Sequence, residues 1–175
     1  MANLKDCPKF ANHDDYYTNK SAWETINHLI PKDKIVWESC MLGSVLSRSP
    51  HYLTELGNQV VYDTEMDMLR QQPAEWDMIV TNIPFDKKIK LPILKRMTEL
   101  DKPFVIILNS MNTFTNYLRE IFAGKMQHLQ IVTPRGKVKF HKCVGGEIKK
   151  TGDPSFYCVY LCYKMNLSNE QQWTC

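Results

Sequence analysis

The sequence predicts an α/β fold: an open, doubly wound, mostly parallel sheet with helices on both faces. Apolar strands alternate with amphipathic helical segments along most of the 175 residues, which is typical of parallel strands joined by crossover helices. The strands are apolar almost throughout, as in "FVIIL" (104–108), and this indicates burial on both faces. Strands follow one another without helices after residue 129, so we expect an antiparallel C-terminal hairpin.

The first half of the chain contains three strands with helices between them. Apolar residues recur at helical spacing over residues 21–30, and Pro31 ends that helix. A second helix is expected over residues 43–56, bent or restarted at Pro50, and a short one over residues 66–72. The expected strands are "KIVWE" (34–38), "QVVYD" (59–63) and "WDMIVTN" (76–82).

The second half begins with two further helices. One is expected over residues 92–100, with Pro92 in its first turn, where a missing N–H costs nothing. The other is expected over residues 113–123, closed by Gly124 in the position of a left-handed cap. The expected strands are "KPFVIILNS" (102–110), "LQIVTP" (129–134), "KVKFHK" (137–142) and "SFYCVYLCYK" (155–164).

Length and composition favour one globular domain inside the cell. The chain is 43% hydrophobic and 23% charged, with a net charge of +3, values ordinary for a soluble protein. Its longest apolar runs are too short to cross a bilayer, and residues 1–10 lack the apolar core of a secretory signal. We therefore expect a single cytoplasmic domain without membrane contact.

The cysteine pattern argues against disulfides and against a metal site. The six cysteines are scattered without a CxxC pair, which favours reduced thiols. A zinc site could be drawn from His141, Cys143, Cys158 and Cys162. However, an extended strand would hold Cys158 and Cys162 about 13 Å apart, whereas sulfurs sharing a zinc ion lie only ~4 Å apart. We expect no metal.

Polar residues end three successive strands. Glu38 ends the first, Asp63 the second and Asn82 the third. Ligands of open α/β sheets bind beyond the carboxyl ends of the strands, and a carboxylate after the second strand suits a ribose hydroxyl pair. Each residue alone could equally be an ordinary polar strand end. Together they indicate a nucleotide-like ligand.

The stretch "TNIPF" (81–85) resembles a motif of the class I S-adenosylmethionine-dependent methyltransferases. The amino-methylating branch of that family carries Asn/Asp-Pro-Pro-aromatic after a strand. Here the tetrapeptide is Asn82-Ile83-Pro84-Phe85, with a branched aliphatic in place of the first proline. The resemblance implies a Rossmann-like methyltransferase fold and S-adenosylmethionine as cofactor.

The rest of the chain resembles the small N6-adenine methyltransferases of phages and large DNA viruses. The segments that carry this resemblance are residues 16–38, 94–108, 131–140 and 156–167. It implies one methyltransferase domain over residues 1–175, with a core of about 16–167. It also implies methylation of adenine N6 in DNA or RNA.

The resemblance gives the tetrapeptide a catalytic role. The adenine amine is a poor nucleophile because its lone pair is delocalised into the ring. The Asn82 Oδ1 atom and the Ile83 carbonyl would accept its hydrogens, Pro84 would shape the loop, and Phe85 would stack on the flipped base.

The resemblance also assigns cofactor contacts by position. The loop after Glu38 has one glycine, Gly43, where the family has several, so Met41 and Leu42 are expected to crowd the cofactor. Asp63 would bind the ribose, and Asp67 would accept a hydrogen bond from the amino group of the cofactor's adenine. The full set of expected cofactor residues is Tyr17, Thr18, Glu38, Gly43, Asp63, Asp67, Met68 and Asn82.

Two basic stretches are candidates for contact with nucleic acid. Lys87 and Lys88 directly follow the tetrapeptide. A basic hairpin is expected over residues 135–142, where lysines alternate with apolar residues; its candidate residues are Arg135, Lys137 and Lys139. Both stretches could equally be solubilising surface. Phosphate contacts would make binding strongly salt-dependent.

Two other functions remain open at this point. The glycine-poor loop would also suit a degenerate methyltransferase that only binds nucleic acid or serves as a partner subunit. The tetrapeptide would also suit guanine amines or protein glutamine amides. A homo- or hetero-oligomer is compatible with either.

Overall fold

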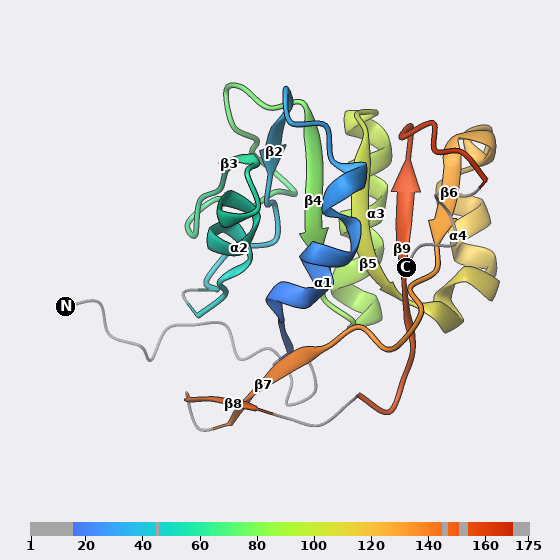
Figure 1. The fold of residues 1–175 in the computed structure, drawn as a ribbon. Coiled ribbons are helices and arrows are strands. Elements are labelled where there is room, and N and C mark those ends of the chain that lie inside the picture. Colours follow the sequence, from blue (N-terminus) through green and yellow to red (C-terminus); the bar gives the residue numbers. More distant parts are fainter. Residues whose placement is uncertain (1–15, 45, 145–146, 151–153, 170–175) are drawn as a thin grey trace.

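The computed structural model describes residues 16–44, 46–144, 147–150 and 154–169. Its larger sheet has the strand order β3-β2-β4-β5-β9-β6 (Figure 1). The first four of these strands are parallel, and β9 runs antiparallel to both β5 and β6. The strands are β2 (Ile35–Trp37), β3 (Gln59–Val61), β4 (Met78–Asn82), β5 (Phe104–Asn109), β6 (Leu129–Val132) and β9 (Cys158–Tyr163).

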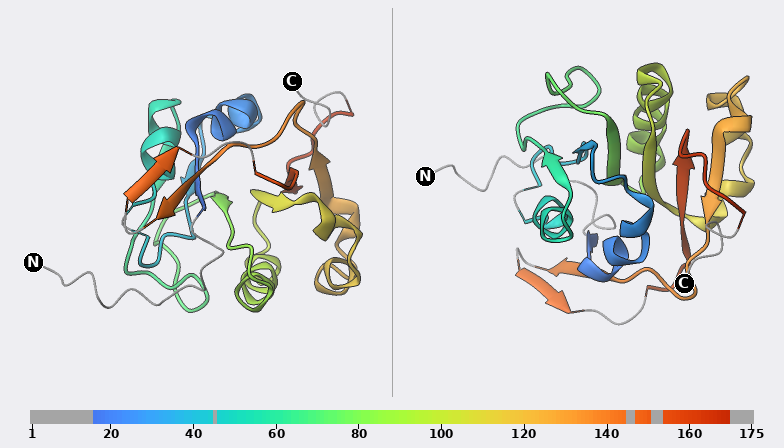
Figure 2. Two further views of the ribbon diagram at one scale, coloured as in Figure 1. Left: turned by 90° about the horizontal axis from the view of Figure 1, so that it is seen from below. Right: turned by 45° about the horizontal axis from the view of Figure 1, so that its top comes forward.

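Helices cover both faces of this sheet, so the predicted doubly wound fold is confirmed (Figure 2, left). Helix α1 (Lys20–Ile26), the short 3₁₀ helix η1 (Asn27–Leu29) and α2 (Ser49–Glu55) lie on one face. Helices α3 (Lys87–Leu100) and α4 (Asn116–Ile121) lie on the other. Alternate residues of each strand therefore enter two separate apolar cores, as Trp37 and Val36 do.

Buried polar contacts fix α1 against its neighbours. The Asn19 side chain accepts from the Ser21 amide and begins the helix. Trp23 is fully buried, and its Nε1 atom donates to Ser49 Oγ at 3.2 Å. On the sheet side, the Tyr160 hydroxyl donates to the Ala22 carbonyl at 2.6 Å. These bonds connect α1 to both α2 and β9.

Three of the expected helices are shorter than predicted or absent, two of them in the first half of the chain. The helix expected over residues 43–56 is limited to α2, which begins at Ser49 with a proline in its first turn. Residues 66–72 form turns instead of a helix. There the Asp67 Oδ1 atom accepts from the Leu69 amide, a local bond that competes with helix formation.

Helix α3 begins a full turn earlier than expected. The Asp86 side chain accepts from the Lys88 amide at 2.7 Å and caps the helix there. Pro92 consequently lies inside the helix and not in its first turn. Helix α4 is likewise shorter than predicted, because the 3₁₀ helix η2 (Ser110–Phe114) occupies the segment before it.

A second sheet of three strands lies at the end of the larger sheet toward which β4 runs (Figure 1). Strand β1 (Tyr16–Thr18) pairs with β7 (Phe140–Val144), which pairs with β8 (Glu147–Lys150), all antiparallel. The hairpin expected over residues 135–142 is therefore misplaced: the observed hairpin is β7–β8, and residues 135–139 precede it. Strands β1 and β8 were not predicted.

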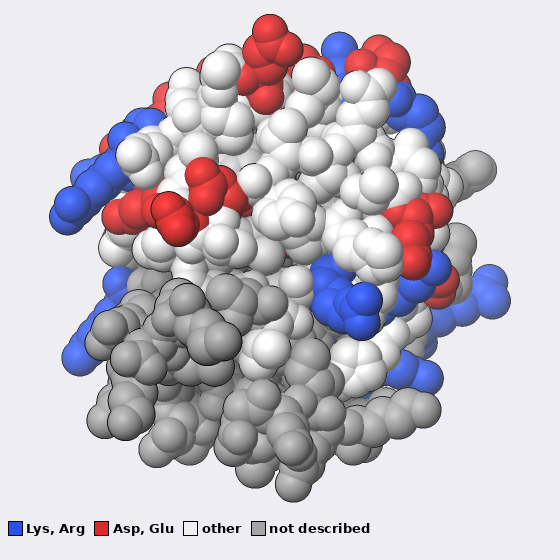
Figure 3. All heavy atoms as spheres, turned by 90° about the vertical axis from the view of Figure 1, so that its left-hand side faces the viewer, with Lys and Arg blue, Asp and Glu red and all other residues white. Residues whose placement is uncertain are grey.

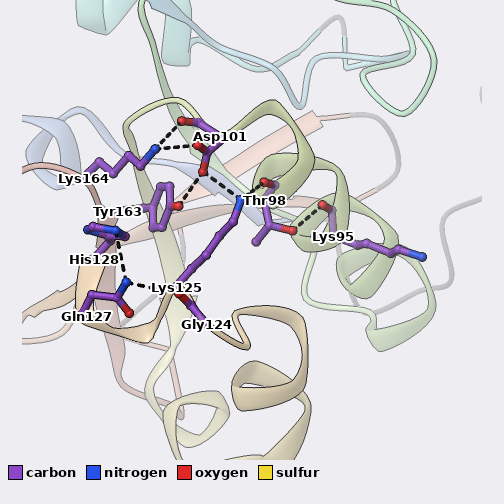
Figure 4. A network of polar contacts seen from close by, with 9 residues as sticks. All are labelled: Lys95, Thr98, Asp101, Gly124, Lys125, Gln127, His128, Tyr163 and Lys164. Atoms are coloured by element: carbon purple, nitrogen blue, oxygen red, sulfur yellow. Dashed lines mark hydrogen bonds and ion pairs between the residues drawn. The ribbon is translucent and has the colours of Figure 1, made fainter.

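A polar network ties three elements together at the opposite end of the large sheet (Figure 4). Asp101 caps α3 with a left-handed backbone, at φ 54°. Its carboxylate accepts from Lys125 Nζ, Lys164 Nζ and the Tyr163 hydroxyl at 2.7–2.8 Å. Lys125, Lys164 and Tyr163 together hold the pKa of the Asp101 carboxyl well below its usual range.

No helix in the described part of the chain is long and apolar enough to cross a membrane.

Candidate active site

A pocket of about 330 Å³ opens where β2 and β4 end. Four separate segments form it: β1, the loop after β2, the turn after β3 and the segment after β4. The structure brings together most of the residues predicted from the sequence. Those that line the pocket are Tyr17, Thr18, Glu38, Gly43, Asp67, Met68, Asn82, Ile83, Pro84 and Phe85.

One expected cofactor residue, Asp63, does not line this pocket. Its side chain is exposed, and its Oδ1 atom accepts from the Glu65 amide at 2.8 Å. Its assignment to the ribose stays a prediction.

The basic candidates also lie outside the pocket. Lys87 and Lys88 are exposed in the first turn of α3. Arg135, Lys137 and Lys139 line a second cavity of about 180 Å³ beside α1. Val138 and Phe140 are buried, as the alternation predicted. On the side of β3 and α2, small groups of basic and acidic residues are separated by uncharged surface (Figure 3).

Glu38 is a buried carboxyl group at the base of the pocket. It is 3% exposed, and its Oε1 atom accepts from Thr81 Oγ1 and from the Cys40 amide. Burial raises the pKa of Glu38 to about 7, against the opposing effect of these hydrogen bonds. The carboxyl therefore stays protonated to a higher pH than an exposed glutamate does.

The Cys40 thiol lies beside Glu38 and is followed by the Met68 sulfur. Burial, reinforced by the Glu38 carboxylate, raises the pKa of Cys40 to about 12 and keeps it a neutral thiol. Its Sγ atom lies 3.9 Å from Met68 Sδ. Among the described residues, no three His, Cys, Asp or Glu side chains are grouped to hold a metal ion.

The one glycine in the loop after β2 lies where the backbone has a positive φ. Gly43 has a φ of 66°, which a side chain would disfavour. Its amide donates to the Thr64 carbonyl at 2.9 Å, and the Ser44 amide donates to the Met41 carbonyl at 2.8 Å. Met41 is buried and is not among the pocket residues, whereas Leu42 lines the pocket. Of the two side chains expected to crowd the cofactor, Leu42 is therefore the one that reaches the pocket, and its effect on the cofactor stays a prediction.

The Asn82 side chain leaves an acceptor without a partner. Asn82 ends β4, where it pairs with Ile107 of β5. Its Oδ1 atom is buried and has no hydrogen-bond partner within the described part of the chain. Leaving such an atom unpaired costs about 1–3 kcal/mol, and nearly all buried polar atoms in proteins do have partners. This oxygen is suited to accept a hydrogen from a ligand.

The residues after Asn82 are held firmly in place. Ile83 is fully buried among the side chains of the core beneath α3. Phe85 packs edge-to-face against three rings, with centroid distances of 6.3 Å to Tyr16, 5.8 Å to Phe140 and 5.3 Å to Phe156. These three rings come from segments distant in the sequence, so no local pattern predicts that they surround Phe85.

A buried lysine also braces this segment. Lys90 is 4% exposed, and its Nζ atom donates to the Phe85 carbonyl at 3.3 Å and to Asn112 Oδ1 at 2.9 Å. It was missed in the sequence, although its spacing from Ile93, Leu94 and Met97 places it on the buried face of α3.

Comparisons with known proteins give structural matches alone. No protein-family model matches the chain, and no curated protein sequence does. Solved structures that match include TehB from Haemophilus influenzae (TM-score 0.45, 14% identity, 83% of this chain) and an S-adenosylmethionine-dependent O-methyltransferase from Thermotoga maritima (0.43, 10%, 82%). The human methyltransferase 10 domain containing protein also matches (0.40, 11%, covering 83% of this chain and 80% of that one).

The chain spans 62% and 64% of the lengths of the first two structures. With TM-scores this low, the fold is assigned from the sheet topology described above.

Proposed function

We propose that the chain is an S-adenosylmethionine-dependent methyltransferase that methylates the N6 amine of adenine in DNA or RNA. The observation that carries the proposal is the buried, unpartnered Asn82 Oδ1 atom in a pocket shared with Phe85. An exocyclic amine supplies the hydrogen that this oxygen lacks. A planar base beside it suits the aromatic ring.

The surrounding residues position the reacting amine. The Asn82 Oδ1 atom and the Ile83 carbonyl accept its two hydrogens and aim the nitrogen lone pair. Ile83 is fixed by its burial and Phe85 by its three neighbouring rings. Because direct methyl transfer needs little beyond alignment, such rigidity supplies much of the rate.

The pocket residues fit the cofactor. S-adenosylmethionine supplies a methyl group on a positively charged sulfur, together with amino and hydroxyl donors. The pocket offers acceptors at Glu38 and Asp67, and the close backbone approach at Gly43. Glu38, Gly43, Asp67 and Met68 would hold the cofactor, and Tyr17 and Thr18 would close over it.

The test compares three forms of residue 82. Asn82→Ala is expected to lower methyl transfer to an adenine-bearing oligonucleotide by about 100-fold or more. Asn82→Asp keeps an acceptor oxygen and should retain measurable transfer. Calorimetric titration with S-adenosylhomocysteine should show that Asn82→Ala still binds the cofactor, so that a loss of transfer is not a loss of binding.

Two results would contradict the proposal. Full transfer by Asn82→Ala would remove the catalytic role of the amide. Transfer to a glutamine-bearing protein, with none to nucleic acid, would assign the same acceptors to a planar side-chain amide.

A further inference from the structure

Three large side chains outside the pocket are unusually exposed. Met111 is 69% exposed, Phe114 82% and Tyr157 62%. Met111 and Phe114 belong to η2, which follows β5, and the Ser110 amide donates to the Tyr157 carbonyl at 2.9 Å. Single exposed apolar residues are common, whereas a group of them indicates a binding surface.

Hydrogen bonds connect this surface, formed by Met111, Phe114 and Tyr157, to the segment that contains the candidate catalytic residues. Lys90 Nζ donates both to the Phe85 carbonyl and to Asn112 Oδ1, in the middle of η2. Asn112 Oδ1 also accepts from the Tyr117 hydroxyl. A ligand lying on η2 is therefore held at a fixed distance from the Asn82–Phe85 segment.

One cation lies over an exposed ring, and another lies over the half-buried ring of Tyr117. Lys137 Nζ lies 5.1 Å from the centroid of the Tyr157 ring and also donates to the Pro154 carbonyl at 2.8 Å. Lys87 Nζ lies 5.9 Å from the Tyr117 ring, and Lys88 is exposed next to it. The nearby acid, Asp86, uses its carboxylate to cap α3. Exposed rings with lysines in the neighbouring segments match a ligand that combines planar bases with phosphates.

We propose that this surface binds the nucleotides that flank the target base in a single-stranded nucleic acid. This inference rests on the proposed function. Phe114 and Tyr157 stack on unpaired bases, Met111 packs beside them, and Lys87, Lys88 and Lys137 contact phosphates. A duplex keeps its bases stacked on one another, so it cannot offer them to these rings.

The test uses a fluorescein-labelled oligothymidylate and fluorescence anisotropy, without cofactor. This probe has no adenine, so binding is measured independently of methyl transfer. Phe114→Ala and Tyr157→Ala should each weaken binding by about fivefold or more, whereas Phe114→Tyr should bind like the wild type. A duplex of equal length should bind more weakly than the single strand.

Tyr62→Ala is the matched control. Tyr62 is 54% exposed but follows β3, which β2 and β4 separate from β5. Its loss should leave binding unchanged, and circular dichroism should show that each variant is folded.

Several outcomes would overturn the proposal: no binding of oligothymidylate by the wild type, equal binding of the duplex, or wild-type affinity in Phe114→Ala and Tyr157→Ala. A lower mass of Phe114→Ala in light scattering, with oligothymidylate binding unchanged, would assign the surface to protein association instead. Oligothymidylate binding that requires Phe114, in a protein that never transfers methyl, would leave this surface standing and reject the proposed function alone.

Discussion

At the scale of single residues, the ionisation of Glu38 in the pocket makes the stability of the protein depend on pH. Its pKa is raised from 4.5 to about 7 in the folded protein, so folding favours the neutral carboxyl over the carboxylate. The contribution to stability is full below pH 4.5 and is lost as pH rises through 7. The loss amounts to about 3 kcal/mol in the free energy of unfolding.

Glu38→Gln removes this titration and keeps a hydrogen-bonding side chain. Urea denaturation across this pH range should show the variant gaining stability relative to the wild type as pH rises. Parallel stability curves for the two proteins would show that Glu38 does not titrate in this range.

The two acids after β3 should differ in their effect on cofactor binding. Asp67 lines the pocket and Asp63 does not. We expect Asp67→Ala to weaken S-adenosylhomocysteine binding about tenfold or more, since a charge-assisted hydrogen bond is lost. Because Asp63 lies outside the pocket, Asp63→Ala should weaken binding less than Asp67→Ala does. A larger loss in Asp63→Ala than in Asp67→Ala, measured by calorimetric titration, would contradict this order.

The sequence predicts which residues line the centre of the pocket, but it does not predict the burial or hydrogen bonding of their side chains. "TNIPF" points to Asn82 and Phe85, and both line the pocket. The missing partner of Asn82 Oδ1 and the burial that raises the pKa of Glu38 depend on packing between distant segments. Neither follows from local pattern.

At the scale of elements, Asp101 joins the end of α3 to the end of β9. Its pKa is lowered by Lys125, Lys164 and Tyr163, so its contribution to stability is present at neutral pH and lost in acid. Asp101→Asn should melt at a lower temperature than the wild type at about pH 7, and the difference should shrink as pH falls through 3.8. A difference that is constant with pH would mean that the charge contributes nothing.

The strands of the large sheet can be predicted from the sequence more accurately than the residues at which the helices begin. Apolar runs such as β5, which are too short for a helix, are typical of buried strands. Helix starts depend on single caps: Asp86 begins α3 ahead of Pro92, and the Asp67 side chain favours a turn. Strands β1 and β8 are short and polar, and they exist through pairing with β7.

At the scale of the whole molecule, the pocket exists because the fold gathers four segments at one edge of the sheet. The parallel strands end there, and the small sheet adds Tyr16, Tyr17 and Thr18 from β1. The exposed rings of η2 and Tyr157 lie outside the pocket and extend the same region. We propose that this region of the molecule combines a cofactor pocket, an amine acceptor and a surface for flanking bases.

The most direct measurement is the identity of the methylated product. The protein would be incubated with labelled S-adenosylmethionine and a single-stranded oligonucleotide containing one adenine, and the nucleosides would be separated by mass spectrometry. We predict label on the adenine N6 amine with the wild-type protein and a loss of at least about 100-fold with Asn82→Ala. Folded protein that binds the cofactor but labels no amine, or labels as well without Asn82, would contradict the account.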